Sequence, residues 1–169
     1  QREELRAAHD RAANEHSLLD DAIESLSDGF ALYDSDDRLL LCNQPYREIY
    51  RDSAPAIVIG ATFESIVRYG LERGQYPQAG ATDGDREAWL AERLHRHRHP
   101  DGVPLLQELR GNCWLRIDER RTRGGGVAGV RTDVTEMVRT RQDLEIAAAA
   151  LKGANAQLEE LSATDALTG

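Results

Sequence analysis

The residues best suited to chemistry are three histidines that alternate along one charged stretch, His95, His97 and His99. His95 and His99 have the i, i+4 spacing that places two imidazoles on one face of a helix, as metal ligands often are. Pro100 disfavours helix at His99, and no cysteine or carboxylate accompanies the histidines at ligand spacing. We therefore predict no metal site. We interpret the interspersed arginines as a solvated basic face: Arg93, Arg96 and Arg98.

Other catalytic patterns are weaker still. The run Gly124-Gly125-Gly126 lacks the Lys-Ser/Thr that follows in a phosphate-binding loop, so a turn between strands is the better interpretation. We recognise no pairing of a nucleophile with a base and predict no catalytic residues in this chain. Cys42 and Cys113 lie far apart without a Cys-x-x-Cys motif, which indicates a reducing, cytoplasmic setting.

Composition limits what the chain can bury and bind. It has 169 residues, of which 40% are hydrophobic, 30% charged and only 5% aromatic, so we expect one modest core. The net charge of -9 disfavours nucleic acid and anionic lipid as partners. Because no apolar run approaches ~20 residues, we predict no membrane contact within this chain, although a longer parent protein could be attached upstream.

Periodicity and turn residues divide the chain into helices and strands. Asn43 is placed to cap a short helix that contains Pro45, and Asp85 to cap a later one. Half-buried strands are expected on both sides of the helical middle of the chain. In order, the predicted elements are a helix at 1–26, strands at 30–34 and 38–42, a helix after 43, helices at 62–71 and 86–98, and strands at 103–110, 113–122 and 127–133.

This order of elements, with two sequence runs, resembles the PAS domain family. The runs are DGFALYDSDDRLLLCNQPYREIY near the start and WLRIDERRTRGGGVAGVRTDVTE near the end, whose Asp-Val-Thr is similar to the family's Asp-Ile-Thr exit signature. The resemblance implies an α+β fold, with a five-stranded antiparallel sheet and short helices over residues 27–135. Coiled-coil helices at 1–26 and 136–163 are expected on either side.

The exit motif suggests how such a domain could pass on a signal. Asp133 ends the last predicted strand, and its carboxylate could pair with Arg116 or Arg131 or cap the following helix. The Thr135 side chain could also accept hydrogen bonds from the first amides of that helix. Distortion of the sheet would then reach the start of the helix. The alternative interpretation is a simple helix cap without a signalling role.

The predicted final helix carries a seven-residue repeat of leucine, at Leu144, Leu151 and Leu158. This is the spacing of a coiled-coil seam, so we expect a parallel homodimer. A coiled-coil seam needs a second set of residues beside the leucines, and two sets are available here. We therefore hypothesise that the paired helices can switch between two seams by a small rotation. The more apolar choice is Ala147, Ala154 and Leu161, and the alternative is Ala148, Asn155 and Ser162.

The last residues resemble the entry of the GGDEF family of bacterial diguanylate cyclases, whose catalytic domain opens with Asp-x-Leu-Thr-Gly directly after a coiled-coil helix. The residues that carry the resemblance are Asp165, Leu167, Thr168 and Gly169. It implies that 164–169 begin a GGDEF domain whose catalytic part, with its GTP and magnesium, lies beyond this chain. We expect the sensory and dimerisation region of a cyclase that makes cyclic di-GMP. The alternatives are a ligand-free PAS dimerisation scaffold and the sensor of a histidine kinase.

No cofactor motif is evident. A haem held by a histidine, as in some PAS sensors, and a small organic ligand in the PAS core are the two candidates that the resemblance leaves open. Three aromatic residues are the candidate walls of a pocket for the organic ligand, with ordinary core packing as the alternative. They are Tyr69, Trp89 and Trp114.

Overall fold

The computed structural model describes residues 1–168, and for Thr168 only the backbone. The chain forms two compact units, one spanning Gln1–Asp133 and one that begins at Val134. The first unit contains one sheet of five strands, in the order β2-β1-β5-β4-β3. All neighbouring strands are antiparallel. The strands are β1 Gly29–Tyr33, β2 Leu39–Cys42, β3 Leu105–Leu109, β4 Cys113–Arg121 and β5 Val127–Asp133.

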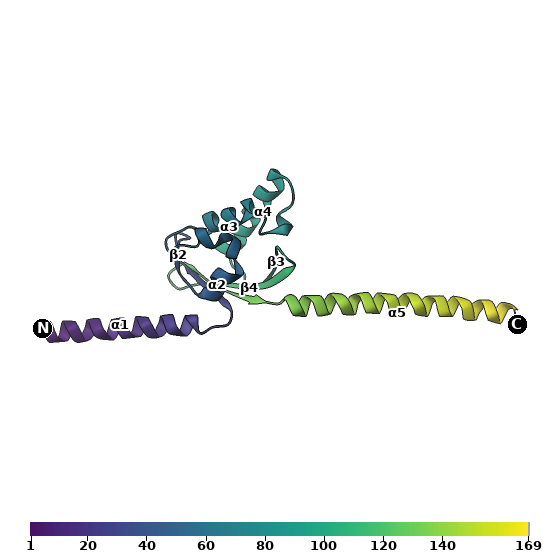
Figure 1. Ribbon diagram of the computed structural model, residues 1–169, viewed down its shortest axis with the longest axis horizontal. Helices are drawn as coiled ribbons and strands as arrows, with labels where there is room; N and C mark the ends of the chain where they lie inside the picture. Colours follow the sequence, from purple (N-terminus) through teal and green to yellow (C-terminus); the bar gives the residue numbers. More distant parts are fainter. Residues whose placement is uncertain (169) are drawn as a thin grey trace. The chain divides into compact units, whose positions relative to one another are not determined.

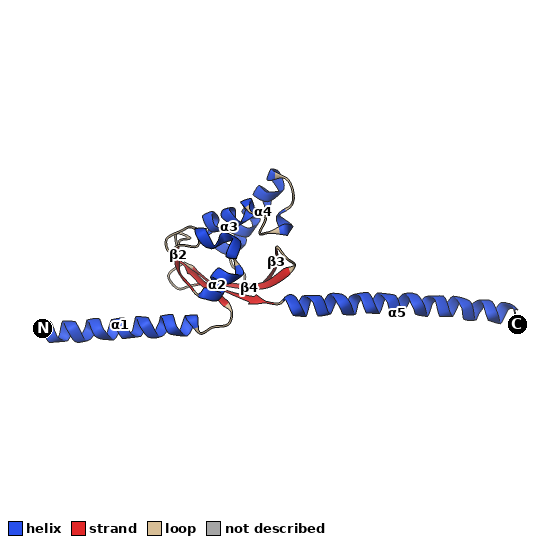
Figure 2. Ribbon diagram, in the orientation of Figure 1, coloured by secondary structure: helices blue, strands red, loops and turns tan. Residues whose placement is uncertain are grey.

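The strand order follows from which segments pair across the chain. Strand β5 is central, because it pairs with β1 on one side and with β4 on the other. The first hairpin and the last three strands therefore form a single sheet, drawn in red in Figure 2. The predicted α+β fold with a five-stranded antiparallel sheet is confirmed.

Short helices cover one face of this sheet, above the strands in Figure 1. Alternate strand residues point toward them, as Tyr33, Leu115 and Ile117 do with at most 1% of their surface exposed. The core consequently lies between the sheet and the helices. The helical elements of the first unit are α1 Arg2–Glu24, α2 Gln44–Ile49, η1 Arg51–Ala56, α3 Phe63–Glu72, η2 Pro77–Ala79 and α4 Asp83–Arg98.

Helix α4 begins earlier than the sequence predicts. Thr82 is its N-cap and accepts a hydrogen bond from the backbone N–H of Asp85. The Asp85 carboxylate in turn accepts from the Thr82 backbone N–H, so the two residues form a capping box. The prediction of Asp85 as the N-cap was wrong, because Asp83 and Gly84 are already helical and place Asp85 three residues after the cap.

Asn43 caps α2, as predicted, and also joins three segments of the chain. Its Oδ1 accepts hydrogen bonds from the backbone N–H groups of Tyr46 at 3.1 Å and Phe30 at 2.8 Å. Its Nδ2 donates to the carbonyl oxygens of Ile23 at 3.1 Å and Asp28 at 2.9 Å. The fully buried amide thus ties the end of α1 and the start of β1 to α2.

We expect Asn43→Ala to lower the free energy of unfolding by about 2–4 kcal/mol, because it removes a helix cap and leaves buried backbone groups without partners. Urea unfolding followed by circular dichroism measures the change. Gln44→Ala is the matched control, since that neighbouring side chain is exposed and should shift stability by no more than about 0.5 kcal/mol. Equal effects of the two substitutions would contradict this role of Asn43.

The second unit consists of helix α5, Thr135–Thr168. The seam leucines Leu144, Leu151, Leu158 and Leu161 are 63–65% exposed along it. The helix continues through Asp165 and Leu167, beyond the predicted boundary at 163, while Gly169 lies outside the described residues. Within residues 1–168, no helix combines the length and the apolar character needed to cross a membrane.

Candidate functional site

A cluster of charged side chains lies inside the core, centred on Glu119 of β4. One carboxylate oxygen, Oε1, lies 2.8 Å from Nη2 of Arg93 on α4. The other, Oε2, lies 3.2 Å from Nη2 of Arg131 on β5. The three side chains are 8%, 4% and 1% exposed, respectively. Charges removed this far from water require partners, and here a single carboxylate is shared by two guanidinium groups.

His97 of α4 extends the cluster toward the surface. Its Nδ1 lies 2.6 Å from Oε2 of Glu119, and its Nε2 lies 3.1 Å from Oδ1 of Asp37 in the β1–β2 turn. The ring is fully buried and stacks on Phe63, with centroids 3.7 Å apart. The prediction of a solvated basic face was therefore wrong for Arg93, which faces the core as His97 does. Both extend the inward stripe of α4, and carboxylates from other elements compensate them.

The carboxylates of the cluster are held in their ionised form. Burial alone would raise the pKa of Glu119, but the charges of Arg93 and Arg131 and the hydrogen bond from His97 outweigh it and hold that pKa far below its usual range. For Asp37, burial is likewise outweighed by the hydrogen bonds from His97 and Arg98, so its pKa is also lowered.

These lowered pKa values predict acid sensitivity with a definite sign. As pH falls below about 4.5, the unfolded chain takes up protons at these carboxyls before the folded chain does, so folding stability is lost. Above about pH 5, the contribution of these ionised carboxylates to folding stability is fully present. We expect the urea midpoint to fall between pH 5 and pH 3, and the difference between the wild type and Asp37→Asn to shrink over this interval. A constant difference would contradict the assignment.

A small cavity lies next to the cluster, between the helices and the sheet. Its volume is about 10 Å³, which is space for one water-sized group. Its walls combine apolar side chains with phenol, amide and guanidinium groups. They are Tyr46, Tyr50, Phe63, Ile66, Val67, Tyr76, Arg93, Gln107 and Arg131.

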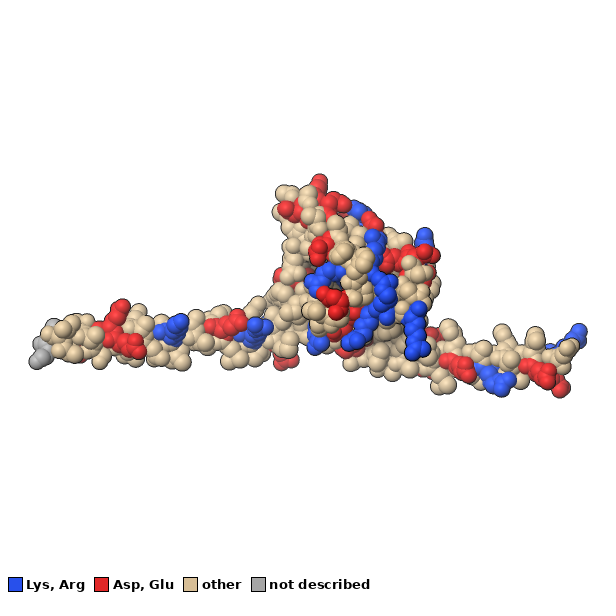
Figure 3. Space-filling model, turned by 180° about the vertical axis from the view of Figure 1, so that it is seen from behind, with Lys and Arg blue, Asp and Glu red and all other residues tan. Residues whose placement is uncertain are grey.

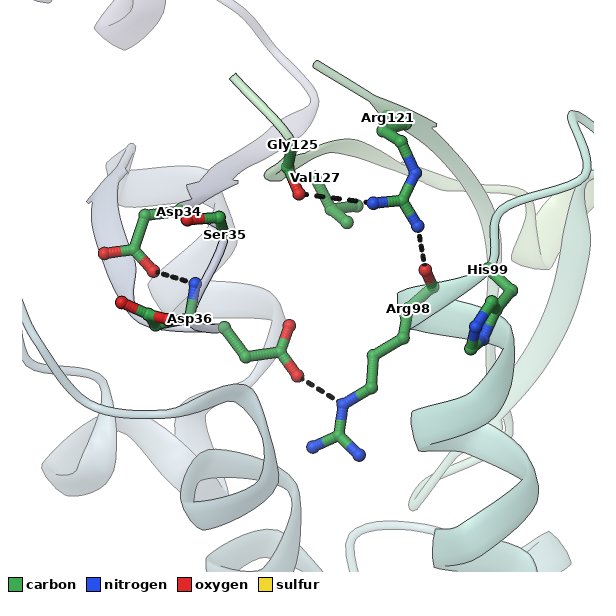
Figure 4. A pocket seen from close by; sticks show the side chains of 9 residues that line it. Asp34, Ser35, Asp36, Arg98, His99, Arg121, Gly125 and Val127 are labelled. Carbon is green, nitrogen blue, oxygen red and sulfur yellow. Dashed lines mark hydrogen bonds and ion pairs between the residues drawn. The ribbon is translucent and has the colours of Figure 1, made fainter. Parts of the chain in front are cut away.

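A larger cleft of about 400 Å³ opens on the surface by the β1–β2 turn, the end of α4 and the β4–β5 hairpin (Figure 4). In it, Arg98 Nε donates to Asp37 Oδ2 at 2.7 Å. Arg121 donates to the carbonyl oxygens of Arg98 and Gly125. Asp37 contacts Arg98 in the cleft and His97 in the core, so it links the surface to the buried cluster.

The candidate relay residues are distributed over both faces of the sheet. Arg131 points into the core, where its Nε donates to the Tyr50 hydroxyl at 3.4 Å in addition to its contact with Glu119. Arg116 is exposed on the opposite face, with its Nε 3.1 Å from Oδ2 of Asp118. Asp133 is the last residue of β5 and pairs in register with Leu115 of β4. Thr135 begins α5.

The three candidate pocket walls do not converge. Tyr69 on α3 is half-buried beneath the guanidinium of Arg73, whose carbon lies 3.3 Å from the ring centroid. Trp89 on α4 packs on Tyr76, with centroids 4.8 Å apart. Trp114 alternates with the buried Leu115 on β4, so it lies on the face of the sheet away from the core. Tyrosines that the sequence did not single out line the core cavity instead.

Within residues 1–168, no group of three or more histidine, cysteine, aspartate or glutamate side chains is placed to hold a metal ion. His95 and His99 do lie side by side, with ring centroids 4.6 Å apart, and His99 Nδ1 is 3.1 Å from the His95 carbonyl oxygen. Through this contact His99 satisfies a backbone carbonyl at the end of α4, an ordinary C-terminal arrangement.

Charges on α5 are mixed in sign. Figure 3 shows acidic and basic side chains alternating in small groups along this helix. Arg141 and Glu145, for example, form an i, i+4 ion pair at 3.2 Å. Charges of both signs on this side of the helix are compatible with two copies pairing through the exposed leucines.

Comparisons with known proteins give one family and several distant likenesses. The family model described as PAS fold matches residues 23–142. The non-motile and phage-resistance protein of Caulobacter vibrioides is 32% identical over 168 residues, or 94% of this chain. This chain spans only 18% of that protein's length.

Two solved structures illustrate the distant likenesses. The sensor region of a sensor histidine kinase is 19% identical, with 66% of this chain and 40% of that chain covered and a TM-score of 0.43. The PAS domain of BvgS from Bordetella pertussis is 21% identical, with 79% and 98% covered and a TM-score of 0.41.

Proposed function

Since this chain belongs to the PAS fold family, we propose that it is the sensory and dimerising region of a larger signalling protein, and that it relays the state of its sheet through α5. The supporting observation is the direct connection between the two units. Strand β5, which is central in the sheet, ends at Asp133, and α5 begins two residues later at Thr135. Because Val134 alone separates the two elements, we expect a change in β5 to be passed to the start of the helix.

The helix suits this role because of its length and its repeat. It has 34 residues, and its leucines recur every seven positions with most of their surface exposed. A lone helix gains nothing from such a stripe, whereas two parallel copies bury it as a coiled coil. Domains joined to the ends of the two helices would then be held in a defined mutual orientation.

The partner activity that we propose is cyclic di-GMP synthesis. Asp165 and Leu167 at the end of α5 resemble the entry of a diguanylate cyclase domain, and two such domains must face each other, each with GTP and magnesium, to form the product. The relation between helix pairing and activity then follows directly: a change in the pairing of α5 changes how often the two domains meet.

The parent protein provides the test. Incubated with GTP and Mg²⁺, it should form cyclic di-GMP, and a substitution that disrupts the α5 seam should reduce the rate. Incorporation of phosphate from ATP onto a histidine, with no cyclic di-GMP, would show that the region is instead the sensor of a histidine kinase. Native mass spectrometry of the present chain separates ligand sensing from a ligand-free scaffold, since an organic ligand would add a discrete mass.

A further inference from the structure

We propose that the cavity lined by Arg93, Gln107 and Arg131 binds one small monovalent anion of halide size. The proposal concerns the core alone and does not depend on which domain follows α5. It starts from an unmatched donor. In the part of the chain that the structure describes, Nη1 of Arg93 has no hydrogen-bond partner although it is buried. This side chain is 4% exposed and lines the cavity.

The charges around the cavity do not balance. Arg93 and Arg131 each carry a permanent positive charge, and they share the single carboxylate of Glu119. Asp37 does not make up the difference, because it contacts His97 and is also paired with Arg98. None of the nine lining residues named above is an aspartate or a glutamate. A local excess of positive charge thus remains beside the cavity, in a medium of low dielectric constant where an anion is attracted strongly.

The phenols cannot supply the missing negative charge. Burial raises the pKa of Tyr46 to about 12 and raises that of Tyr76 further, so both stay protonated at neutral pH. As neutral hydroxyls they are hydrogen-bond donors, like the Arg93 guanidinium. Tyr50 lies with its hydroxyl 3.4 Å from both Arg131 Nε and Gln107 Oε1. The Tyr46 hydroxyl is 3.0 Å from the Tyr33 hydroxyl, and the Tyr50 hydroxyl donates to Gln107. The wall donor left without a partner is Arg93 Nη1, and this is the group that we expect a halide to bind.

Size restricts the class of anion. A cavity of about 10 Å³ has room for a single small group. Chloride and bromide are somewhat larger than water and are the small anions closest to this size, whereas an organic carboxylate such as gluconate is excluded. A water molecule would fit the same volume. It would leave the excess charge uncompensated, and this difference makes the two occupants distinguishable.

Thermal unfolding of the full 169-residue chain tests the proposal. At constant ionic strength, replacing sodium gluconate by sodium chloride or bromide should raise Tm along a saturating curve, by roughly 5 °C at ten times Kd. Equal Tm values in gluconate and halide at every concentration would overturn the proposal and assign the cavity to water.

Two matched variants locate the effect. Gln107→Glu places a carboxylate in the cavity wall with almost no change in shape, so Tm should become independent of halide. Gln78→Glu adds the same charge at an exposed position and should keep the halide response. A response that survives in Gln107→Glu, or that is lost in Gln78→Glu, would overturn the assignment.

A direct measurement decides the matter if Gln107→Glu does not fold. Crystals of the wild-type chain grown in bromide should show an anomalous peak between Arg93, Arg131 and Gln107. A fully occupied water with no anomalous signal at that position would reject the proposal.

Discussion

Replacing Glu119 by Gln is expected to destabilise the domain by about 3–5 kcal/mol, because it leaves two buried guanidinium groups without a counter-charge. The substitution keeps the shape of the side chain, and no cavity is created. The loss therefore reports on charge compensation rather than on packing. Such a change is a large part of the stability of a domain of this size, and urea unfolding at pH 7 measures it.

Asp118→Asn is the control for this experiment. It removes the same charge from the adjacent residue of β4, which lies on the other face of the sheet and pairs with the exposed Arg116. Surface pairs of this kind contribute no more than about 1 kcal/mol. If Glu119→Gln were as mild as Asp118→Asn, the buried cluster would not be a determinant of stability.

The second large effect is expected at the α5 seam. Leu151→Glu should weaken dimerisation by roughly a hundredfold or more, because each copy loses a buried leucine and two carboxylates face each other in the seam. Sedimentation equilibrium of the chain at micromolar concentration measures the change. In the parent protein, we expect the rate of cyclic di-GMP synthesis to fall with the dimer population.

Ala149→Glu provides the matched control, since it introduces the same side chain two residues earlier, on the side of the helix away from the predicted seam. It should leave the dimer unchanged. If the wild type proved monomeric at high concentration, or if both variants behaved alike, the coiled-coil dimer and the relay that depends on it would have to be abandoned.

The two seam choices remain a hypothesis that cross-linking can test. A parallel pair linked through Ala147→Cys reports the apolar seam, and one linked through Ala148→Cys reports the alternative. A stimulus that changes the sheet should shift the ratio of the two cross-links. An unchanged ratio under every condition would mean that α5 has a single register and only holds the two copies together.

The sequence by itself determined the features that depend on local chemistry. Alternating apolar residues gave the strands, because neighbouring side chains of a strand point to opposite faces. Asn43 before Pro45 identified the cap of α2, since a side-chain oxygen must satisfy the first amides of a helix. The leucine heptad likewise marked α5 as one long helix, since it depends only on residue spacing.

Only the tertiary structure decided which charged side chains lie inside the core. The spacing alone would place these charged residues on the core side. Glu119 continues the alternation of Leu115 and Ile117 on β4, and Arg93 lies on the same side of α4 as its buried leucines. An ionised side chain is ordinarily assigned to solvent, because burial without a partner is prohibitively costly. The partners come from different elements, α4, β4 and β5, whose approach no local pattern reveals. The buried charged cluster around Glu119 can therefore be recognised only in the folded chain.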